Sequence, residues 1–273
     1  MSTSVITPTS PPVPASAGLG QTLAPAVTGR NLVKTYGSGD AAVHALRQVS
    51  LDVARAQFTA VMGPSGSGKS TLMHVLAGLD TPDSGEVVVG SSRLSGMKDK
   101  QLTRLRRDHV GFIFQQFNLI PTLTAEENVV LPLQLAGRKP DAGWLRTVVD
   151  AVGLGKRLRH RPAELSGGQQ QRVAVARALA SRPEVIFADE PTGNLDSRTG
   201  AEVLALLRRC VDEFGQTIVM VTHDPMSAAH ADSVVFLDDG HIVSTMREPS
   251  ADGVLAVMKT ISVTHDHPPH RSL

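Results

Sequence analysis

The sequence predicts an α/β protein with a mostly parallel core sheet, an N-terminal antiparallel β region and a helical subdomain. Three observations predict this fold. Short, mostly apolar runs recur, as expected for strands buried on both faces, at 58–62, 110–114, 185–188 and 218–221. Longer stretches with helical spacing separate these runs. Towards the amino end, apolar and polar residues alternate from Val49 to Val53, which is typical of a half-buried antiparallel strand.

The chain is expected to begin with a disordered leader over residues 1–27. This segment is rich in Ser, Thr, Pro and Ala and has no charged side chain, so it lacks the basic start of a secretory signal. Its composition favours an extension without a role of its own over a regulatory segment. A strand over 32–36 and a turn over 37–40 then open the antiparallel region, which continues through 49–53 and 86–89.

The helical subdomain is predicted at about 116–170, inserted between strands of the core. A polar helix over 98–107 precedes it and turns Leu102 and Leu105 inward. Within the insert, residues 125–135 and 143–152 read as helices. A further helix opens at about Leu165 and runs to Leu179, and Pro183 ends it.

The remaining elements complete one domain over residues 28–248. A helical stripe contains Cys210, which we interpret as a small core residue and not as a reactive thiol. Runs at 234–237 and 242–243 predict a closing hairpin. Residues 249–273 are expected to form a flexible tail. Its histidines suggest metal binding, but the composition favours a solvated tail; they are His265, His267 and His270.

Composition excludes several function classes. The 27 basic and 26 acidic side chains leave a net charge of +1, and aromatic residues make up 3% of the chain. We therefore expect no nucleic-acid partner, because such partners need a basic face or stacking platforms. The single cysteine rules out an intrachain disulfide. No apolar run approaches the 18 to 20 residues of a membrane helix, so any work at a membrane would need a partner.

A glycine-rich loop carries the strongest chemical signal. It follows the run at 58–62, precedes a helical stretch at 72–77, and reads Gly63, Pro64, Ser65, Gly66, Ser67, Gly68, Lys69, Ser70 and Thr71. Its glycines let successive N–H groups point inward, and the helix start adds unpaired donors, so the loop is suited to phosphates. Lys69 is predicted to reach the β- and γ-phosphates of a nucleotide, and the Ser70 hydroxyl to bind Mg²⁺.

Other polar side chains follow buried strands directly. Gln115 follows the run at 110–114, Asp189 and Glu190 follow 185–188, and His223 lies just beyond 218–221. Parallel sheets bind ligands at the carboxyl ends of their strands. The glycine-rich loop and these side chains are therefore expected to meet at one edge of the sheet.

At this point the motifs resemble those of ATP-binding cassette (ABC) transporter ATPase subunits, over about residues 27–247. Each motif is weak alone, but they stand in the family's order: Tyr36, Walker A at 63–71, Gln115, the signature at 165–169, Walker B ending at Glu190, Leu195-Asp196 and His223. The resemblance implies the fold of a P-loop NTPase, specifically an ABC-type nucleotide-binding domain, with ATP and Mg²⁺ as cofactors.

The resemblance also implies a role for each residue. Glu190 would position and polarise the attacking water, His223 would contact the γ-phosphate, and Gln115 would complete the water and metal shell. Mg²⁺ would be held by Ser70, Gln115 and Asp189. Tyr36, the only tyrosine, would stack on adenine. The register of Gln115 against Gln116 depends on the family pattern.

A second nucleotide contact is implied at the signature. Its residues begin a helix and so form a second anion site; they are Ser166, Gly167, Gly168 and Gln169. In the family, Walker A of one subunit and the signature of another enclose each ATP, with Asp196 at the seam. The expected partner is a second copy of this chain or a close paralogue.

The segment around Phe114–Pro121 and the motifs at 188–197 and 222–225 resemble the lipoprotein-release and macrolide-export class. Such subunits serve a separate membrane permease from the cytoplasmic face of the cell membrane, and the helical insert would hold its coupling helix. Three functions stay open: driving export or extraction, signalling through a permease, and soluble ABC ATPase work in DNA repair or translation. The third expects a coiled-coil insert or two cassettes, and the sequence has neither. The substrate is read by the permease.

Overall fold

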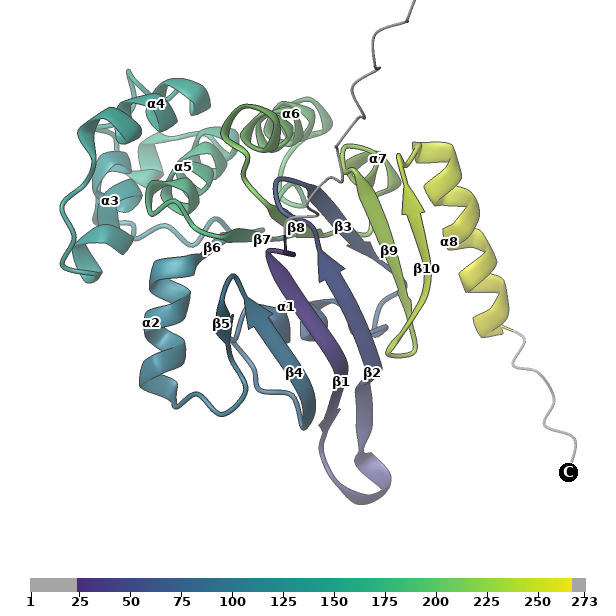
Figure 1. Ribbon diagram of the computed structural model, residues 1–273. Coiled ribbons are helices and arrows are strands. Elements are labelled where there is room, and N and C mark those ends of the chain that lie inside the picture. Colours follow the sequence, from purple (N-terminus) through teal and green to yellow (C-terminus); the bar gives the residue numbers. More distant parts are fainter. Residues whose placement is uncertain (1–23, 267–273) are drawn as a thin grey trace, which may run out of the picture.

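The computed structural model describes residues 24–266, with side chains described as far as residue 262 except that of Asp40 (Figure 1). The predicted leader therefore lies almost wholly outside the described residues, as do His267 and His270. Its last residues belong to the fold, because Ala26 is fully buried and Val27 begins the first strand.

The first sheet is antiparallel and has four strands in the order β2-β1-β4-β5. They are β1 (Val27–Tyr36), β2 (Val43–Val53), β4 (Ser84–Val89) and β5 (Ser92–Arg93). Both β1 and β2 are longer than predicted. Asn31 (φ 48°) and Gln48 (φ 58°) interrupt them, and the pairing register shifts there. Such irregularities break the two-residue alternation, which is why the sequence revealed only part of each strand.

The second sheet has six strands in the order β10-β9-β3-β8-β7-β6. Its members are β3 (Phe58–Met62), β6 (Val110–Phe114), β7 (Val185–Asp189), β8 (Ile218–Val221), β9 (Ser233–Asp238) and β10 (His241–Arg247). All neighbours are parallel except β9 and β10, which form the predicted hairpin. The mostly parallel sheet is confirmed.

Successive residues of the central strands face two different cores. In β7, Ile186 packs with the helices above the six-stranded sheet, whereas Phe187 packs towards helix α1 (Lys69–Leu76) and the first sheet. In β8, Met220 likewise packs with the helices above the sheet, and Val219 packs on the opposite face, towards α1 and the first sheet. Burial on both faces explains the continuous apolar runs.

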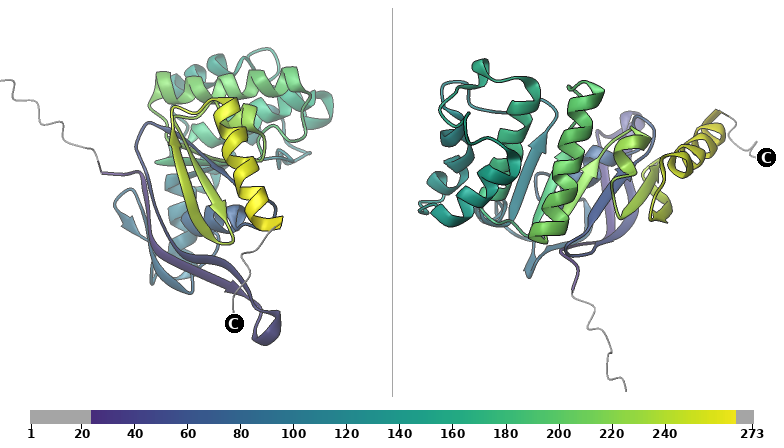
Figure 2. Two further views of the ribbon diagram at one scale, coloured as in Figure 1. Left: turned by 90° about the vertical axis from the view of Figure 1, so that its right-hand side faces the viewer. Right: turned by 90° about the horizontal axis from the view of Figure 1, so that it is seen from above.

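Helices cover the upper face of this sheet in a row from α3 and α4 at one end to α8 at the other (Figure 2). They are α3 (Ala125–Leu135), α4 (Ala142–Val152), α5 (Gly167–Ala180), α6 (Ser197–Phe214), α7 (Pro225–Ala228) and α8 (Ala251–Asp266). Helix α2 (Asp99–His109) lies beside β6, and short 3-10 turns occur at Gly39–Ala41 and Pro162–Glu164.

Helices α3 and α4 both pack against α5. These two lie within the predicted insert at about 116–170, whereas α5 continues to Ala180. The chain's only tryptophan, Trp144, ties α4 to α5, because its indole N–H donates to the Leu179 carbonyl at 3.0 Å. Trp144 also meets Phe214 of α6 edge to face, with ring centroids 5.4 Å apart. Cys210 is fully buried, and burial raises the pKa of its thiol to about 12, as expected of a core residue.

The expectation of a flexible tail over 249–273 is wrong for residues 251–266, which form α8. Its buried residues Val254 and Ile261 join the core above the sheet, and Val257 and Met258 pack against it. The apolar face repeats at helical spacing. Residues 255 and 256 are apolar as well, so the stripe did not stand out in the sequence. His265 therefore lies within α8.

Truncating Val254 to Ala should destabilise the fold by about 2 kcal/mol, because the side chain is fully buried. Its neighbour Leu255 is 42% exposed, so Leu255→Ala is the matched control and should cost less than about 1 kcal/mol. Urea unfolding of the full chain measures both values. Equal losses for the two variants would mean that α8 does not pack as described.

Candidate nucleotide-binding and catalytic site

Two positions of the glycine-rich loop have room only for glycine. A Cβ on Gly63 would lie 2.0 Å from the Leu237 carbonyl oxygen, and one on Gly68 would lie 2.2 Å from that of Ala45. Both glycines also have positive φ, 154° and 101°. The loop thus passes under two other strands before α1 begins at Lys69. The first turn of that helix supplies backbone N–H donors suited to an anion.

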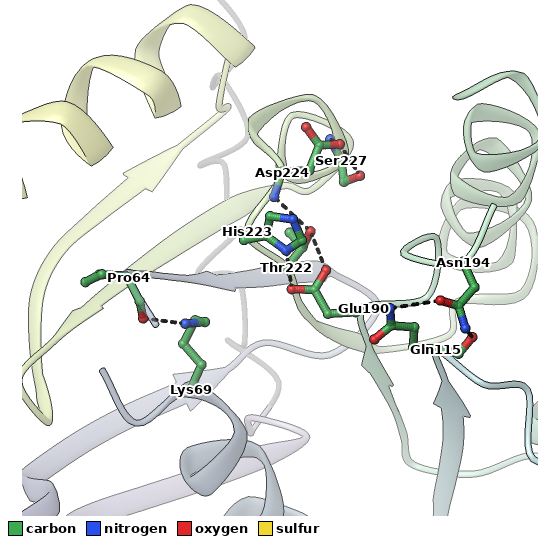
Figure 3. Close-up of polar contacts among 9 residues, drawn as sticks. All are labelled: Pro64, Lys69, Gln115, Glu190, Asn194, Thr222, His223, Asp224 and Ser227. Atoms are coloured by element: carbon green, nitrogen blue, oxygen red, sulfur yellow. Dashed lines mark hydrogen bonds and ion pairs between the residues drawn. The ribbon is translucent and has the colours of Figure 1, made fainter. Parts of the chain in front are cut away.

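Lys69 is held inside this loop. Its Nζ donates to the Pro64 carbonyl at 2.7 Å, across the loop (Figure 3). Burial lowers the pKa of Lys69, and the nearby carboxylates of Glu190 and Asp189 act in the opposite direction. The Ser67 hydroxyl is buried without a hydrogen-bond partner. A cradle with a half-buried cation and an unpartnered hydroxyl is chemically suited to phosphate oxygens.

The parallel strands bring the predicted catalytic residues to one edge. Phe114 pairs with Asp189, Asp189 with Val221, and Val221 with Val61, so one row runs across β6, β7, β8 and β3. The next residues along three of these strands are Gln115, Glu190 and Thr222. This edge is the one that the sequence predicted.

Glu190 occupies a constrained position at that edge. Its backbone is left-handed, with φ 44°, and its N–H donates to the Val221 carbonyl at 3.0 Å. His223 Nδ1 lies 2.7 Å from Oε1 of the carboxylate, and the Thr222 hydroxyl donates to Oε2 at 3.4 Å (Figure 3). The Glu190 side chain is 20% exposed and that of His223 is 75% exposed, so the pair faces outward from the sheet edge.

Asp189, the last residue of β7, is half-buried. Burial raises its pKa, the charge of Glu190 adds to this, and His74 and Lys69 act against it. With the Ser70 hydroxyl, Asp189 offers the oxygen donors that Mg²⁺ prefers. Over residues 24–266 no cluster of three acidic, His or Cys side chains could hold a metal alone. Phosphate oxygens and waters would supply the remaining ligands of a nucleotide-bound Mg²⁺.

Gln115 engages a residue that the sequence analysis did not single out. Its Nε2 donates to Oδ1 of Asn194 at 3.1 Å, and Nδ2 of Asn194 donates back to the Gln115 carbonyl at 3.1 Å (Figure 3). The amide thus points to the segment after Walker B. Gln171, also missed, is buried in α5 and donates to the carbonyls of Pro191 and Phe114. Only its polarity at a buried helix position could have revealed it.

Tyr36 is fixed at the end of β1. Its hydroxyl donates to Asp80 at 2.7 Å, and Lys34, which contacts the same carboxylate at 2.8 Å, lies 5.2 Å from the ring centroid. Burial and the bond to Asp80 raise the pKa of the phenol. The side chain is 42% exposed, which leaves ring surface open to solvent.

The signature residues lie at the start of a different helix. Ser166 caps α5: its hydroxyl accepts from the Gln169 N–H at 3.3 Å, while Oε1 of Gln169 accepts from the Ser166 N–H at 3.0 Å. A Cβ on Gly168 would lie 2.2 Å from the Thr199 methyl, so α5 and α6 approach closely there. Asp196 caps α6 through Thr199, and these bonds lower the pKa of Asp196.

Comparison with known proteins identifies the family. A family profile described as ABC transporter matches residues 46–193. The uncharacterized ABC transporter ATP-binding protein MJ1508 of Methanocaldococcus jannaschii is 48% identical over 224 residues, covering 81% of this chain and 100% of the relative. The macrolide export ATP-binding/permease protein MacB 1/2 of Paracoccus denitrificans is 46% identical over 86% of this chain, which matches 36% of that protein.

A solved structure shares the fold. The ATP-binding cassette MJ0796, in a dimeric post-hydrolysis state bound to ADP and Pi, superposes with a TM-score of 0.73. It is 43% identical, and the match covers 82% of this chain and 99% of that one. No helix within residues 24–266 has the length and apolar character to cross a membrane.

We expect Asp189→Asn to raise the melting temperature of the nucleotide-free protein at neutral pH. A carboxyl group whose pKa is raised on folding destabilises the fold above that pKa, so the gain should shrink as the pH falls. Mg²⁺-dependent ATP hydrolysis should be lost. Asp150→Asn makes the same charge change at an exposed position of α4 and is the control. A lower melting temperature for Asp189→Asn alone would contradict the burial argument.

Proposed function

This chain belongs to the ABC transporter ATP-binding family, and we propose that two copies close head to tail around two ATP molecules to drive a membrane permease. It is an ATP-binding subunit and an ATPase of that family. We further propose how the site is arranged, what each residue does and that the protein acts at the membrane.

One observation carries the proposal: the chain's two anion-binding features begin different helices. The glycine-rich loop opens α1 at the sheet edge with Glu190 and His223, whereas Ser166 opens α5 in the helical subdomain. A second chain, turned head to tail, would supply Ser166–Gln169 to the ATP held by the first. The dimeric state of the related cassette MJ0796 with ADP and Pi supports this arrangement.

In the proposed reaction Lys69 exchanges the Pro64 carbonyl for the β- and γ-phosphates. Glu190 orients and polarises the attacking water, and His223 keeps the carboxylate in place from 2.7 Å. Ser70 and Asp189 would hold Mg²⁺, which neutralises charge on the phosphates when bound. Gln115 would join them only after leaving Asn194, 3.1 Å away.

Tyr36 would supply a stacking face for adenine. Asp80 fixes its hydroxyl and Lys34 lies beside the ring, so adenine would stack on the surface that remains open. Asp196 would lie at the seam between the two chains, at the start of α6.

An apolar groove of about 350 Å³ suits the permease contact. It runs between α2, β6, α3 and α5, and its lining includes Leu79, Phe112, Pro132 and Leu135. Leu79 is 45% exposed and Leu135 is 71% exposed, so two large apolar side chains in the groove lining are open to a partner. We assign the groove to a cytoplasmic helix of the permease, which would hold this chain at the cytoplasmic face of the membrane.

Export or extraction is the favoured task of that permease. MacB of Paracoccus denitrificans is named as a single macrolide export ATP-binding/permease protein, and this chain matches about a third of it. By analogy, this chain would drive a membrane permease of an exporter. Signalling through such a permease uses the same cassette chemistry, so identifying the permease would decide between the two.

Replacing Glu190 with Gln should leave ATP binding intact and slow hydrolysis at least about 100-fold, because the water loses its polarising carboxylate. The variant should then accumulate as an ATP-bound dimer in sedimentation experiments. Ser166→Arg is the companion variant: it should lose hydrolysis and dimer formation but bind ATP as a monomer. Turnover of Glu190→Gln at the wild-type rate would remove Glu190 from its assigned role.

A charge placed in the groove should separate transport from chemistry. We expect tagged Leu135→Glu to lose its membrane partner in mild-detergent pull-downs while keeping ATP hydrolysis, because the groove is apolar. Leu255→Glu adds the same charge at an exposed position of α8, so this variant should keep the partner. Recovery of equal amounts of permease by both variants would place the docking surface elsewhere.

A further inference from the structure

Arg177 of α5 forms hydrogen bonds to the turn that follows Gln115. Its guanidinium donates to the Phe117 carbonyl at 2.9 Å and, through its other terminal nitrogen, to the Asn118 carbonyl at 2.5 Å. Between residues 24 and 262 no carboxylate pairs with Arg177, and burial lowers the pKa of its guanidinium. A partly buried arginine whose recorded bonds go to two adjacent carbonyls acts on the backbone of that turn.

The turn needs such support. Phe117 and Asn118 have φ values of 60° and 49°, so two successive residues without glycine adopt the left-handed conformation. Asparagine tolerates this region, but a bulky residue such as phenylalanine does so rarely. Such conformations persist only where neighbouring contacts hold them.

The turn also contacts the signature. A Cβ on Gly167 would lie 3.7 Å from Cζ of the Phe117 ring, so the ring lies against the first turn of α5. The same helix holds the other side of the loop, because Gln171 donates to the Phe114 carbonyl at 3.4 Å. Helix α5 therefore contacts the Gln115 loop at two places: at Phe114, where the loop begins, and at the Phe117–Asn118 turn. The second contact includes the signature residue Gly167.

We propose that Arg177 is a positioning residue that fixes the Phe117–Asn118 turn, and with it the Gln115 loop, to the signature helix. The idea rests on the proposed function, in which Gln115 and the signature contact ATP in different chains. Asn118 and Arg177 also line the apolar groove. A permease segment bound there would press on the same turn, and the loop and α5 would move together.

Arg177→Lys tests this role, because lysine keeps the charge but lacks the planar fork that bridges two carbonyls. We expect kcat for ATP hydrolysis to fall roughly tenfold. The ATP affinity of the single chain should be unchanged, because the hydrogen bonds of Arg177 go to the Phe117–Asn118 turn and not to the glycine-rich loop. Hydrogen exchange in the 114–119 peptide should become faster. Unchanged Trp144 emission will show that α4 and α5 still pack together.

A second substitution distinguishes positioning from general stability. Glycine adopts the left-handed conformation more readily than asparagine, so Asn118→Gly eases one of the two turn positions and Arg177→Lys/Asn118→Gly should regain part of the lost kcat. Ala56→Gly relieves the same kind of strain at φ 54° in an exposed turn far along the chain, and it should not restore kcat. Should Arg177→Lys fail to fold, Phe117→Ala removes the ring contact and should lower kcat in the same way.

Wild-type kcat and exchange rates in Arg177→Lys would overturn the proposal, as would equal restoration by Asn118→Gly and Ala56→Gly. The exchange measurement does not depend on catalysis. If the unmodified protein did not hydrolyse ATP, the proposed function would fail, whereas faster exchange of the 114–119 peptide in Arg177→Lys would still support the positioning role.

Discussion

The in-register alignment of four parallel strands is the constraint on which the rest of the site depends. Backbone pairing fixes Phe114, Asp189, Val221 and Val61 in one row, so the residues after them must emerge together. Each strand is buried on both faces, and a slip of one residue would expose its apolar side chains to the wrong core. Burial of the apolar strand residues therefore sets the positions of the catalytic groups, although the catalytic groups themselves are polar.

The charged groups of the site are costly to bury, which bears on how ATP acts. Burial disfavours the charged form of Lys69 and, independently, that of Asp189. Phosphates and Mg²⁺ would bring the opposite charges to both groups, so binding should stabilise this region of the protein. Helix α5 then links this chemistry to the partner chain, because it starts with Ser166 and holds the Gln115 loop through Arg177.

The sequence predicted the parallel core, the glycine-rich loop and the edge where Glu190 and His223 meet, because each depends on local spacing. It did not predict what depends on tertiary contacts. The pairing of Gln115 with Asn194 joins residues 79 positions apart. The role of Arg177 could not be predicted either, since its carbonyl partners lie 59 and 60 residues away.

Helix α8 was missed for a different reason. Its apolar face, with Val254 and Ile261, belongs to a core that distant elements build. Apolar residues also occupy positions 255 and 256, so the helical stripe did not stand out and residue composition suggested a tail. In contrast, the role of Gly63 was predicted from the motif and explained by the structure, where a side chain would collide with Leu237.

The most direct test of the head-to-tail arrangement is cross-linking between chains. Two chains, both carrying Glu190→Gln, would each bear one added cysteine, Ser65→Cys or Ser166→Cys, both at exposed positions. Buried Cys210, with its pKa of about 12, should not react. We predict that a short bismaleimide joins the unlike chains only when ATP is present. Absence of that product with ATP, or an internal cross-link in a chain bearing both cysteines, would contradict the account.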